Sequence, residues 1–173
     1  ILKKTETFAR RTIRDKNLDV ALRHVANAFA ETEQLAQALI ILNDVSEISN
    51  RTPVLITAAT KQALAGDAAA ALATANNIDE VRFRAVVLGT IALTQAENGA
   101  MPAAEGPLEM ALAAIKKIKL TYARSYAVSR VALATAGIGK LSDALVKSPL
   151  ICKKAVQSAE EIDDNQLRAH TLR

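Results

Sequence analysis

The sequence has little of several things that many folds of its size use. It has no tryptophan and only five aromatic residues in 173. It has one cysteine, Cys152, so an internal disulfide framework is excluded. Six glycines and four prolines leave few interruptions for long helices. The longest apolar runs, such as residues 38–42, fall far short of the roughly 20 residues that cross a bilayer. We therefore predict a soluble chain without a membrane span.

The compartment stays open on this evidence. The chain begins at Ile1 rather than methionine, so a cytoplasmic location and a periplasmic one after removal of an export signal are both compatible with it. A protein without disulfides fits either compartment.

Alanine is the residue that the sequence has in quantity, with 35 of 173 positions. Alanine is the best helix former because its side chain loses no rotamer entropy, and small side chains let helices pack closely. Charge is segregated: residues 1–25 carry seven Lys and Arg against three Asp and Glu, residues 26–110 four against ten, and residues 111–173 eleven against five. Such segregation is typical of an elongated array, in which position in the sequence maps to position along an axis.

A short pattern recurs along the chain. Residues 78–85 and 162–169 share an Ile-Asp pair and an Arg-Ala pair six residues after the isoleucine, and residues 118–125 keep the isoleucine and the arginine. Weaker copies precede them, so the predicted anchors are Ile13, Ile48, Ile78, Ile118 and Ile162. A glycine lies 21 residues after the third and fourth anchors and 18 after the second. Spacings of 30 to 44 residues are typical of helical hairpins that bury their apolar faces only by stacking.

Glycine, proline and aspartate positions indicate where helices begin and end. We predict no strand, and helices over residues 3–14, 18–31, 33–47, 52–65, 67–77, 79–97, 102–117, 120–136, 141–161 and 163–173. Helix ends are expected at Gly66, Gly99 and Gly137 or Gly139, and helix starts near Pro53, Pro102 and Pro149. Asp79 is the predicted N-cap of one helix, and Asp163 with Gln166 three residues later has the capping-box pattern. One domain is predicted, with units at 3–31, 33–66, 67–99, 102–139 and 141–173.

The best-defined unit carries small and aliphatic residues at regular positions: Ala71-Leu72, Ile78, Arg84-Ala85, Leu88, Ile91-Ala92, Ala96 and Gly99. With these residues the chain, from about residue 33 onward, resembles divergent members of the tetratricopeptide-like class of α-solenoids. The resemblance implies an all-α fold, a right-handed α-solenoid of about four to five antiparallel helical hairpins. It also implies a protein- or peptide-binding concave surface.

Three arginines recur with the repeat and are the candidate partner-binding residues: Arg84, Arg124 and Arg168. The first two lie four and seven residues before apolar positions, so they share the apolar stripe of a helix. Each must extend along its aliphatic stem to water or meet a carboxylate. They are predicted either to line a groove for acidic side chains or to tie one repeat to the next.

Catalytic and cofactor motifs are absent from the sequence. Residues 137–140, Gly-Ile-Gly-Lys, lack the spacing of a phosphate loop and are predicted to be a helix end. His24 and His170 have no metal-ligand spacing around them, and Cys152 has no nearby histidine partner. We predict no catalytic, metal or cofactor site.

The predicted function is a non-catalytic scaffold that binds a protein or peptide. Two alternatives remain: an RNA-binding helical array of the pentatricopeptide kind, which the basic ends favour and the scarce aromatics oppose, and an accessory domain of a larger enzyme. The last unit stops within its second helix, so an uncapped apolar face at Leu167, Ala169 and Leu172 is predicted, open to self-association.

Overall fold

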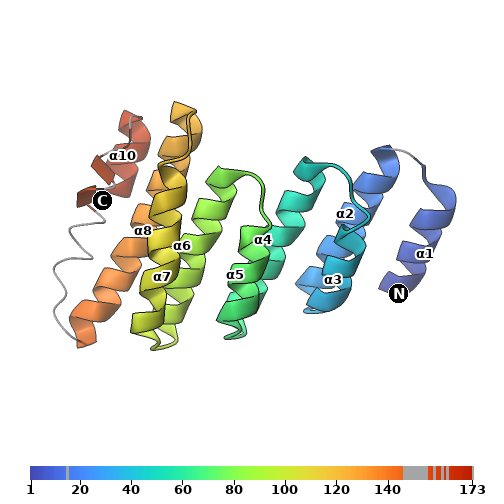
Figure 1. Ribbon diagram of the computed structural model, residues 1–173, viewed down its shortest axis with the longest axis horizontal. Helices are drawn as coiled ribbons and strands as arrows, with labels where there is room; N and C mark the ends of the chain where they lie inside the picture. The colour runs from blue at the N-terminus through green and yellow to red at the C-terminus, as the bar shows by residue number, and fades with distance from the viewer. Residues whose placement is uncertain (15, 146–155, 158, 161, 163, 173) are drawn as a thin grey trace.

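The computed structural model describes residues 1–14, 16–145, 156–157, 159–160, 162 and 164–172. These residues contain no strand, and their helices are α1 (Leu2–Thr12), α2 (Lys16–Glu31), α3 (Leu35–Leu42), α4 (Ile48–Leu64), α5 (Ala68–Asn76), α6 (Val81–Glu97), α7 (Met101–Ile115), α8 (Thr121–Leu145) and α10 (Asn165–Thr171). The predicted all-α class is confirmed. Figure 1 shows the helices side by side in a row that follows the order of the chain, with the two termini near its opposite ends.

Two series of helices make up this row. The first series is α3, α5 and α7, and the second is α2, α4, α6, α8 and α10. Neighbours in the second series pack on one another, and each helix of the first series packs on the second-series helices before and after it. Among the described residues, α3, α5 and α7 make no substantial contact with one another. Each helix is therefore stabilised by elements close to it in the sequence.

Three helices of the second series end in the same turn. Glu33, Gly66 and Gly99 have positive φ angles of 63°, 83° and 81°. At the second turn, the Gly66 N–H donates to the carbonyl oxygen of Ala63 at 2.9 Å, and the Asp67 N–H donates to that of Gln62 at 2.9 Å. Equivalent pairs of hydrogen bonds close the other two turns. This is the Schellman motif, and the helix ends predicted at Gly66 and Gly99 are confirmed.

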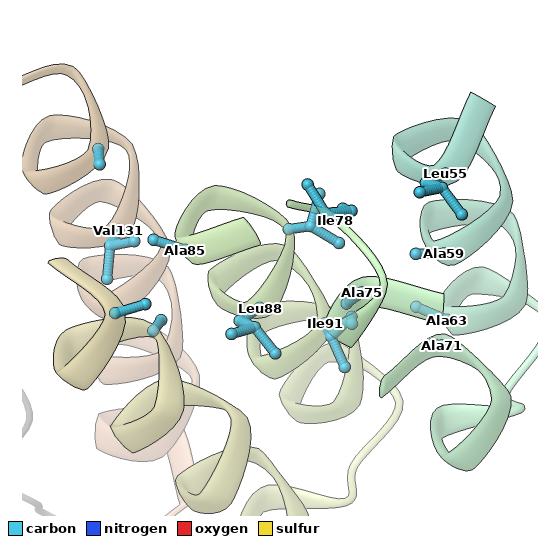
Figure 2. Close-up of a cluster of buried hydrophobic side chains, with 14 of the residues drawn as sticks. Leu55, Ala59, Ala63, Ala71, Ala75, Ile78, Ala85, Leu88, Ile91 and Val131 are labelled. Carbon is cyan, nitrogen blue, oxygen red and sulfur yellow. The ribbon is translucent and has the colours of Figure 1, made fainter. Parts of the chain in front are cut away.

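Burial follows the same spacing of 33 residues from turn to turn. Six buried residues of α4 have a buried counterpart 33 residues earlier in α2 and another 33 residues later in α6. Three of these six sets are Leu22, Leu55 and Leu88; Ala26, Ala59 and Ala92; and Ala30, Ala63 and Ala96. Figure 2 shows part of the resulting core, where leucine and isoleucine side chains lie among alanines of α4, α5 and α6. The alanines let the helices approach closely, and the larger side chains fill the space between them.

One predicted anchor is wrong. Ile48 is 50% exposed, whereas Val45 is 2% exposed and lies in the turn before α4, just as the fully buried Ile78 lies in the turn before α6. Val45 precedes Gly66 by 21 residues, the interval that separates Ile78 from Gly99. The second hairpin therefore has a regular length, and the apparent shortening came from aligning isoleucine with isoleucine.

The fourth hairpin is longer than predicted. α8 has 25 residues against 17 in both α4 and α6, and it runs through Gly137 and Gly139, so the helix end predicted there is wrong. A Cβ atom on Gly137 would lie 2.8 Å from Cδ1 of Leu93 on α6, so this glycine serves close packing rather than a turn. The helix predicted over 141–161 does not begin at 141, and residues 146–155 of it lie outside the described part.

The turn between α3 and α4 also differs from the prediction. α3 ends at Leu42 instead of residue 47, and α4 begins at Ile48 instead of residue 52. The carboxylate of Asp19, on α2, explains this turn: one of its oxygens accepts hydrogen bonds from the backbone N–H groups of Ser46 and Glu47 at 2.9 and 2.8 Å. A cap from another helix leaves no local signal in the sequence.

Several smaller predictions about helix starts change as well. Pro102 lies in the first turn of α7 as predicted, but Pro53 lies inside α4. Position 79 is not an N-cap, because α6 starts after Glu80, which makes no side-chain cap. At α10 the cap is Asp164, whose side chain accepts from the Leu167 N–H at 2.9 Å. Residues 149 and 163 lie outside the described part of the chain.

Candidate functional site

The three predicted arginines occupy equivalent places, each at the fourth residue of its helix, on α6, α8 and α10. Arg84 is half-buried and donates from Nη1 to the carbonyl oxygen of Ile78 at 2.9 Å, which ties α6 to the turn before it. Arg168 is half-buried and bonds Asn165 in its own helix, and Arg124 is exposed. Arg84 and Arg168 thus use these hydrogen bonds within their own hairpins, and whether the arginines bind a partner stays a prediction.

A fourth arginine belongs to the same set. Arg51 is the fourth residue of α4, is half-buried, and its buried Nε atom has no hydrogen-bond partner among the described residues. The predicted anchor Ile48 leads by the six-residue offset to Val54, whereas Val45 leads to Arg51 by the same offset, so the sequence pattern did not reveal this arginine.

The structure brings two turns together into a groove that the arginine pattern did not predict. One side is the start of α6, and the other is the turn between α7 and α8 with the first residues of α8. The groove has a volume of about 390 Å³, and its lining residues are Glu80, Val81, Arg82, Lys117, Ile118, Lys119, Leu120 and Ala123. We call it the turn groove.

The anchor isoleucine explains why the groove is basic. Ile118 is only 9% exposed, so its side chain points into the core, and the lysines on either side of it, Lys117 and Lys119, are exposed. The next residues continue the exposed surface: Leu120 is 74% exposed and Tyr122 is 77% exposed. Positive charge and apolar surface therefore lie next to each other on one short turn.

The opposite side of the groove is held more firmly. The Arg82 guanidinium lies over the ring of Phe83, 4.4 Å from its centroid, and its Nη2 is 3.4 Å from Oε1 of Glu80. Phe83 in turn meets Tyr126 of α8 edge to face, with ring centroids 6.4 Å apart. These contacts fix the guanidinium in place before any ligand arrives, so less side-chain entropy is lost on binding.

The groove carries an excess of positive charge. Glu80 compensates Arg82, but among the described residues the side-chain ammonium groups of Lys117 and Lys119 have no ion pair or hydrogen bond. Val81, Leu120 and Ala123 add aliphatic surface. Such a groove suits a ligand that presents carboxylates beside an apolar side chain. The lysines at 116, 117 and 119 could be seen in the sequence. Their exposure, and the presence of Val81 and Arg82 across the groove, could not be predicted from it.

Where the structure describes them, the residues set aside in the sequence do not line the turn groove. His24 lies 2.8 Å from Nη2 of its neighbour Arg23, and His170 is exposed on α10. Cys152 lies outside the described residues. In the described ranges, no three His, Cys, Asp or Glu side chains are grouped closely enough to hold a metal ion. Residues 137–140 lie inside α8 and form no loop.

Comparison with known proteins gives no relative from which a function could be transferred. No family model, no curated protein and no solved structure matches the chain. None of the helices that the structure describes is both long and apolar enough to cross a membrane. The turn groove is therefore the basis for assigning a function.

Proposed function

We propose that the chain is a non-catalytic scaffold, a right-handed tetratricopeptide-like α-solenoid that binds an acidic peptide segment of a partner protein in the turn groove. The observation that carries the proposal is two exposed lysines, Lys117 and Lys119, which form no ion pair with the described residues and lie on either side of a buried isoleucine, next to the exposed Leu120. Exposed lysines alone are ordinary, but an exposed leucine and tyrosine beside them on a groove are typical of interaction surfaces.

The solenoid part of the proposal is supported by the spacing of the turns. Three Schellman motifs at 33-residue intervals, with burial recurring at the same interval, are what an array of similar stacked units would produce. The helices of the second series form a continuous row, and the turns between hairpin arms lie along one edge of it (Figure 1). An array of this kind can place neighbouring turns side by side, which is how the groove is formed.

The binding mode follows from the lining. Carboxylates of the peptide pair with Lys117 and Lys119, and an aliphatic or aromatic side chain between them packs on Leu120 and Val81. Each exposed ion pair contributes about 0–1 kcal/mol, so apolar contact supplies the remainder and the affinity is moderate. Arg82, held by Glu80 and Phe83, limits the groove on its far side.

The test is selection of ligands from a random-peptide display library on the immobilised chain. We expect enrichment of peptides in which Asp or Glu flanks a Leu, Ile or Phe. For a selected peptide, the double variant Lys117→Glu/Lys119→Glu should weaken binding by about tenfold or more, since each change replaces attraction with repulsion. The matched control is Lys16→Glu/Lys140→Glu, which changes the net charge equally on exposed positions of α2 and α8, outside the groove lining.

The outcomes separate this proposal from the RNA-binding alternative. A single-stranded RNA reader needs several stacking rings, and the groove has one exposed aromatic residue beside it, Tyr122. Selected peptides without acidic residues, or acidic peptides that bind the groove variant and the control equally, would contradict the proposal. Tight, salt-sensitive binding of single-stranded RNA lost in the groove variant would favour the RNA-binding array instead.

A further inference from the structure

The outer surface of α1 has no neighbour among the residues that the structure describes. α1 packs on α2 through one side, where Ala9 is buried and Leu2 joins the core. Its other side carries Phe8, 64% exposed, above a shallow hollow of about 640 Å³ that is lined by Lys3, Lys4, Thr7, Phe8, Arg11 and Thr12. We call these six residues the α1 face. An exposed ring beside basic side chains offers a partner both apolar and charged contacts on one face.

The α1 face is basic because the only acidic side chain of α1 is used elsewhere. Glu6 accepts from Nε of Arg10 at 2.9 Å, and Arg10 also pairs with Asp44 at 2.8 Å. Burial opposes the charge on Arg10, but these hydrogen bonds and charges outweigh it and raise the pKa of the guanidinium above its ordinary value. Lys3, Lys4 and Arg11 have no ion pair among the described residues. A partner for this face must therefore be acidic and must accommodate a phenyl ring.

A surface of that description lies on the same chain. The exposed side of α7 carries Glu105 and Glu109, one helical turn apart and without an ion pair among the described residues. Beside them are Met110, 39% exposed, and Gly106, where a Cβ atom would have no neighbour within 4 Å. The remaining exposed residues on this side are small: Pro102, Ala103 and Ala113. We call this surface the α7 face. Small side chains beside an exposed methionine give this face room for a ring to approach the helix.

We propose that the α1 face of one copy of this chain docks on the α7 face of a second copy. Lys4 and Arg11 flank Phe8 on α1 by four and three residues, so their charges fall on either side of the ring, and Glu105 and Glu109 supply the opposite charges. The two faces cannot meet within one copy, because α2 to α5 lie between α1 and α7 along the row. The same complementarity is visible in the charge balance of residues 1–25 against 26–110.

The two faces are different surfaces, which determines the form of the assembly. A contact between unlike surfaces leaves one of each free on the dimer, so association continues into open chains of copies. One helix against another buries less than the area of a stable dimer interface, so the association is weak and appears at high protein concentration. Because its charged groups are exposed, it is also sensitive to salt.

Light scattering on the full chain tests the proposal. In about 50 mM salt the weight-average mass should rise at least twofold between roughly 10 μM and 1 mM protein, and in about 500 mM salt the rise should be largely lost. Lys4→Glu/Arg11→Glu should abolish the rise, and so should Glu105→Lys/Glu109→Lys. The variant that combines all four changes restores complementary charges with reversed sign and should associate again.

The variant with all four changes distinguishes specific pairing of the two faces from a general effect of net charge, because only specific pairing is restored when both faces are reversed. The matched control Arg130→Glu/Lys140→Glu changes the net charge as much as the α1 variant does, yet it lies on exposed positions of α8 away from both faces and should associate like the parent. Circular dichroism checks that each variant remains helical. A monomer at every concentration would overturn the proposal, as would association that persists in both single-face variants or is not restored in the combined one. None of these outcomes depends on a peptide in the turn groove.

Discussion

At the scale of the residue, the turns show what a single side chain does to a helix end. Gly66 and Gly99 have left-handed backbone at no steric cost, whereas Glu33 has the same conformation with a Cβ atom. A Cβ at either glycine would meet nothing within 4 Å, so the only penalty for a substitution there lies in the backbone. Substitutions at residues 33, 66 and 99 can therefore be compared to measure the cost of a side chain in this left-handed conformation.

We expect Glu33→Gly to stabilise the chain by about 0.5–1 kcal/mol, and Gly66→Ala to destabilise it by about 1 kcal/mol. In a chain of this length 1 kcal/mol corresponds to about 2–4 °C in the melting temperature, which thermal denaturation followed by circular dichroism resolves. Glu33→Ala is the control, because it removes the carboxylate and keeps the strain. If Glu33→Gly and Glu33→Ala melt alike, the backbone is not the source of the difference.

Asp19 is the second residue whose effect can be predicted. Its carboxylate is 9% exposed and accepts two backbone hydrogen bonds from the turn before α4. Asp19→Ala leaves both donors without their acceptor and should cost about 1–3 kcal/mol of unfolding free energy, measured by urea denaturation. Asp19→Asn keeps one acceptor oxygen and should lose less. Equal losses in the two variants would mean that an amide oxygen does not replace the carboxylate, and no loss in either variant would contradict the predicted role of the two hydrogen bonds.

At the scale of the element, the glycines inside helices divide by their surroundings. A Cβ on Gly89 of α6 would lie 3.3 Å from Cγ2 of Val131 on α8, whereas a Cβ on Gly106 of α7 would be in open space. Both substitutions to alanine gain about 1 kcal/mol of helix propensity. The difference between them therefore reports how tightly α6 and α8 pack.

We expect Gly106→Ala to raise the melting temperature by about 2–4 °C and Gly89→Ala to raise it less or to lower it, since the β-branched Val131 has little freedom to move. The measurement is differential scanning calorimetry on the two variants and the parent, at a concentration where the chain is monomeric. A Gly89→Ala variant as stable as Gly106→Ala would show that the α6–α8 contact yields without cost.

The elements also show how far sequence reasoning reaches. The all-α class and the helix ends at Gly66 and Gly99 were predictable, because alanine content and glycine spacing act locally. The start of α4 was not, since it depends on Asp19 from another helix, and the course of α8 through Gly137 was not, since that glycine faces Leu93. The lysines of the turn groove were visible as a basic run. That they face Val81 and Arg82 across a groove depends on packing between hairpins.

At the scale of the whole molecule, the 33-residue interval between turns predicts that one unit can be deleted, which a compact fold would not tolerate. Residues 67–99 comprise α5, its turn, α6 and the third Schellman turn, and both junctions of this segment follow the same kind of turn. In the proposed solenoid, removing the segment joins Gly66 to Ala100 with the register of the array intact.

Deletion of residues 67–99 should therefore leave a folded, helical chain that unfolds cooperatively at a lower temperature, because one pair of stacking interfaces is lost. Circular dichroism and thermal melting measure this, and a deletion of residues 83–99, which removes most of α6 and leaves α5 without its hairpin partner, is the control. A molten or aggregated product from the first deletion would contradict the proposed solenoid. So would equal behaviour of the two deletions.

The lack of substantial contacts among α3, α5 and α7 described above is expected to make the molecule easy to bend and stretch. One row of helices is continuous, and the other is made of separate members, so bending toward or away from the separate row breaks few contacts. A load that pulls the two ends apart is then expected to open the gaps between these helices before any hairpin unfolds. We expect the chain to respond as a soft spring, with stiffness set by the contacts of α2, α4, α6 and α8.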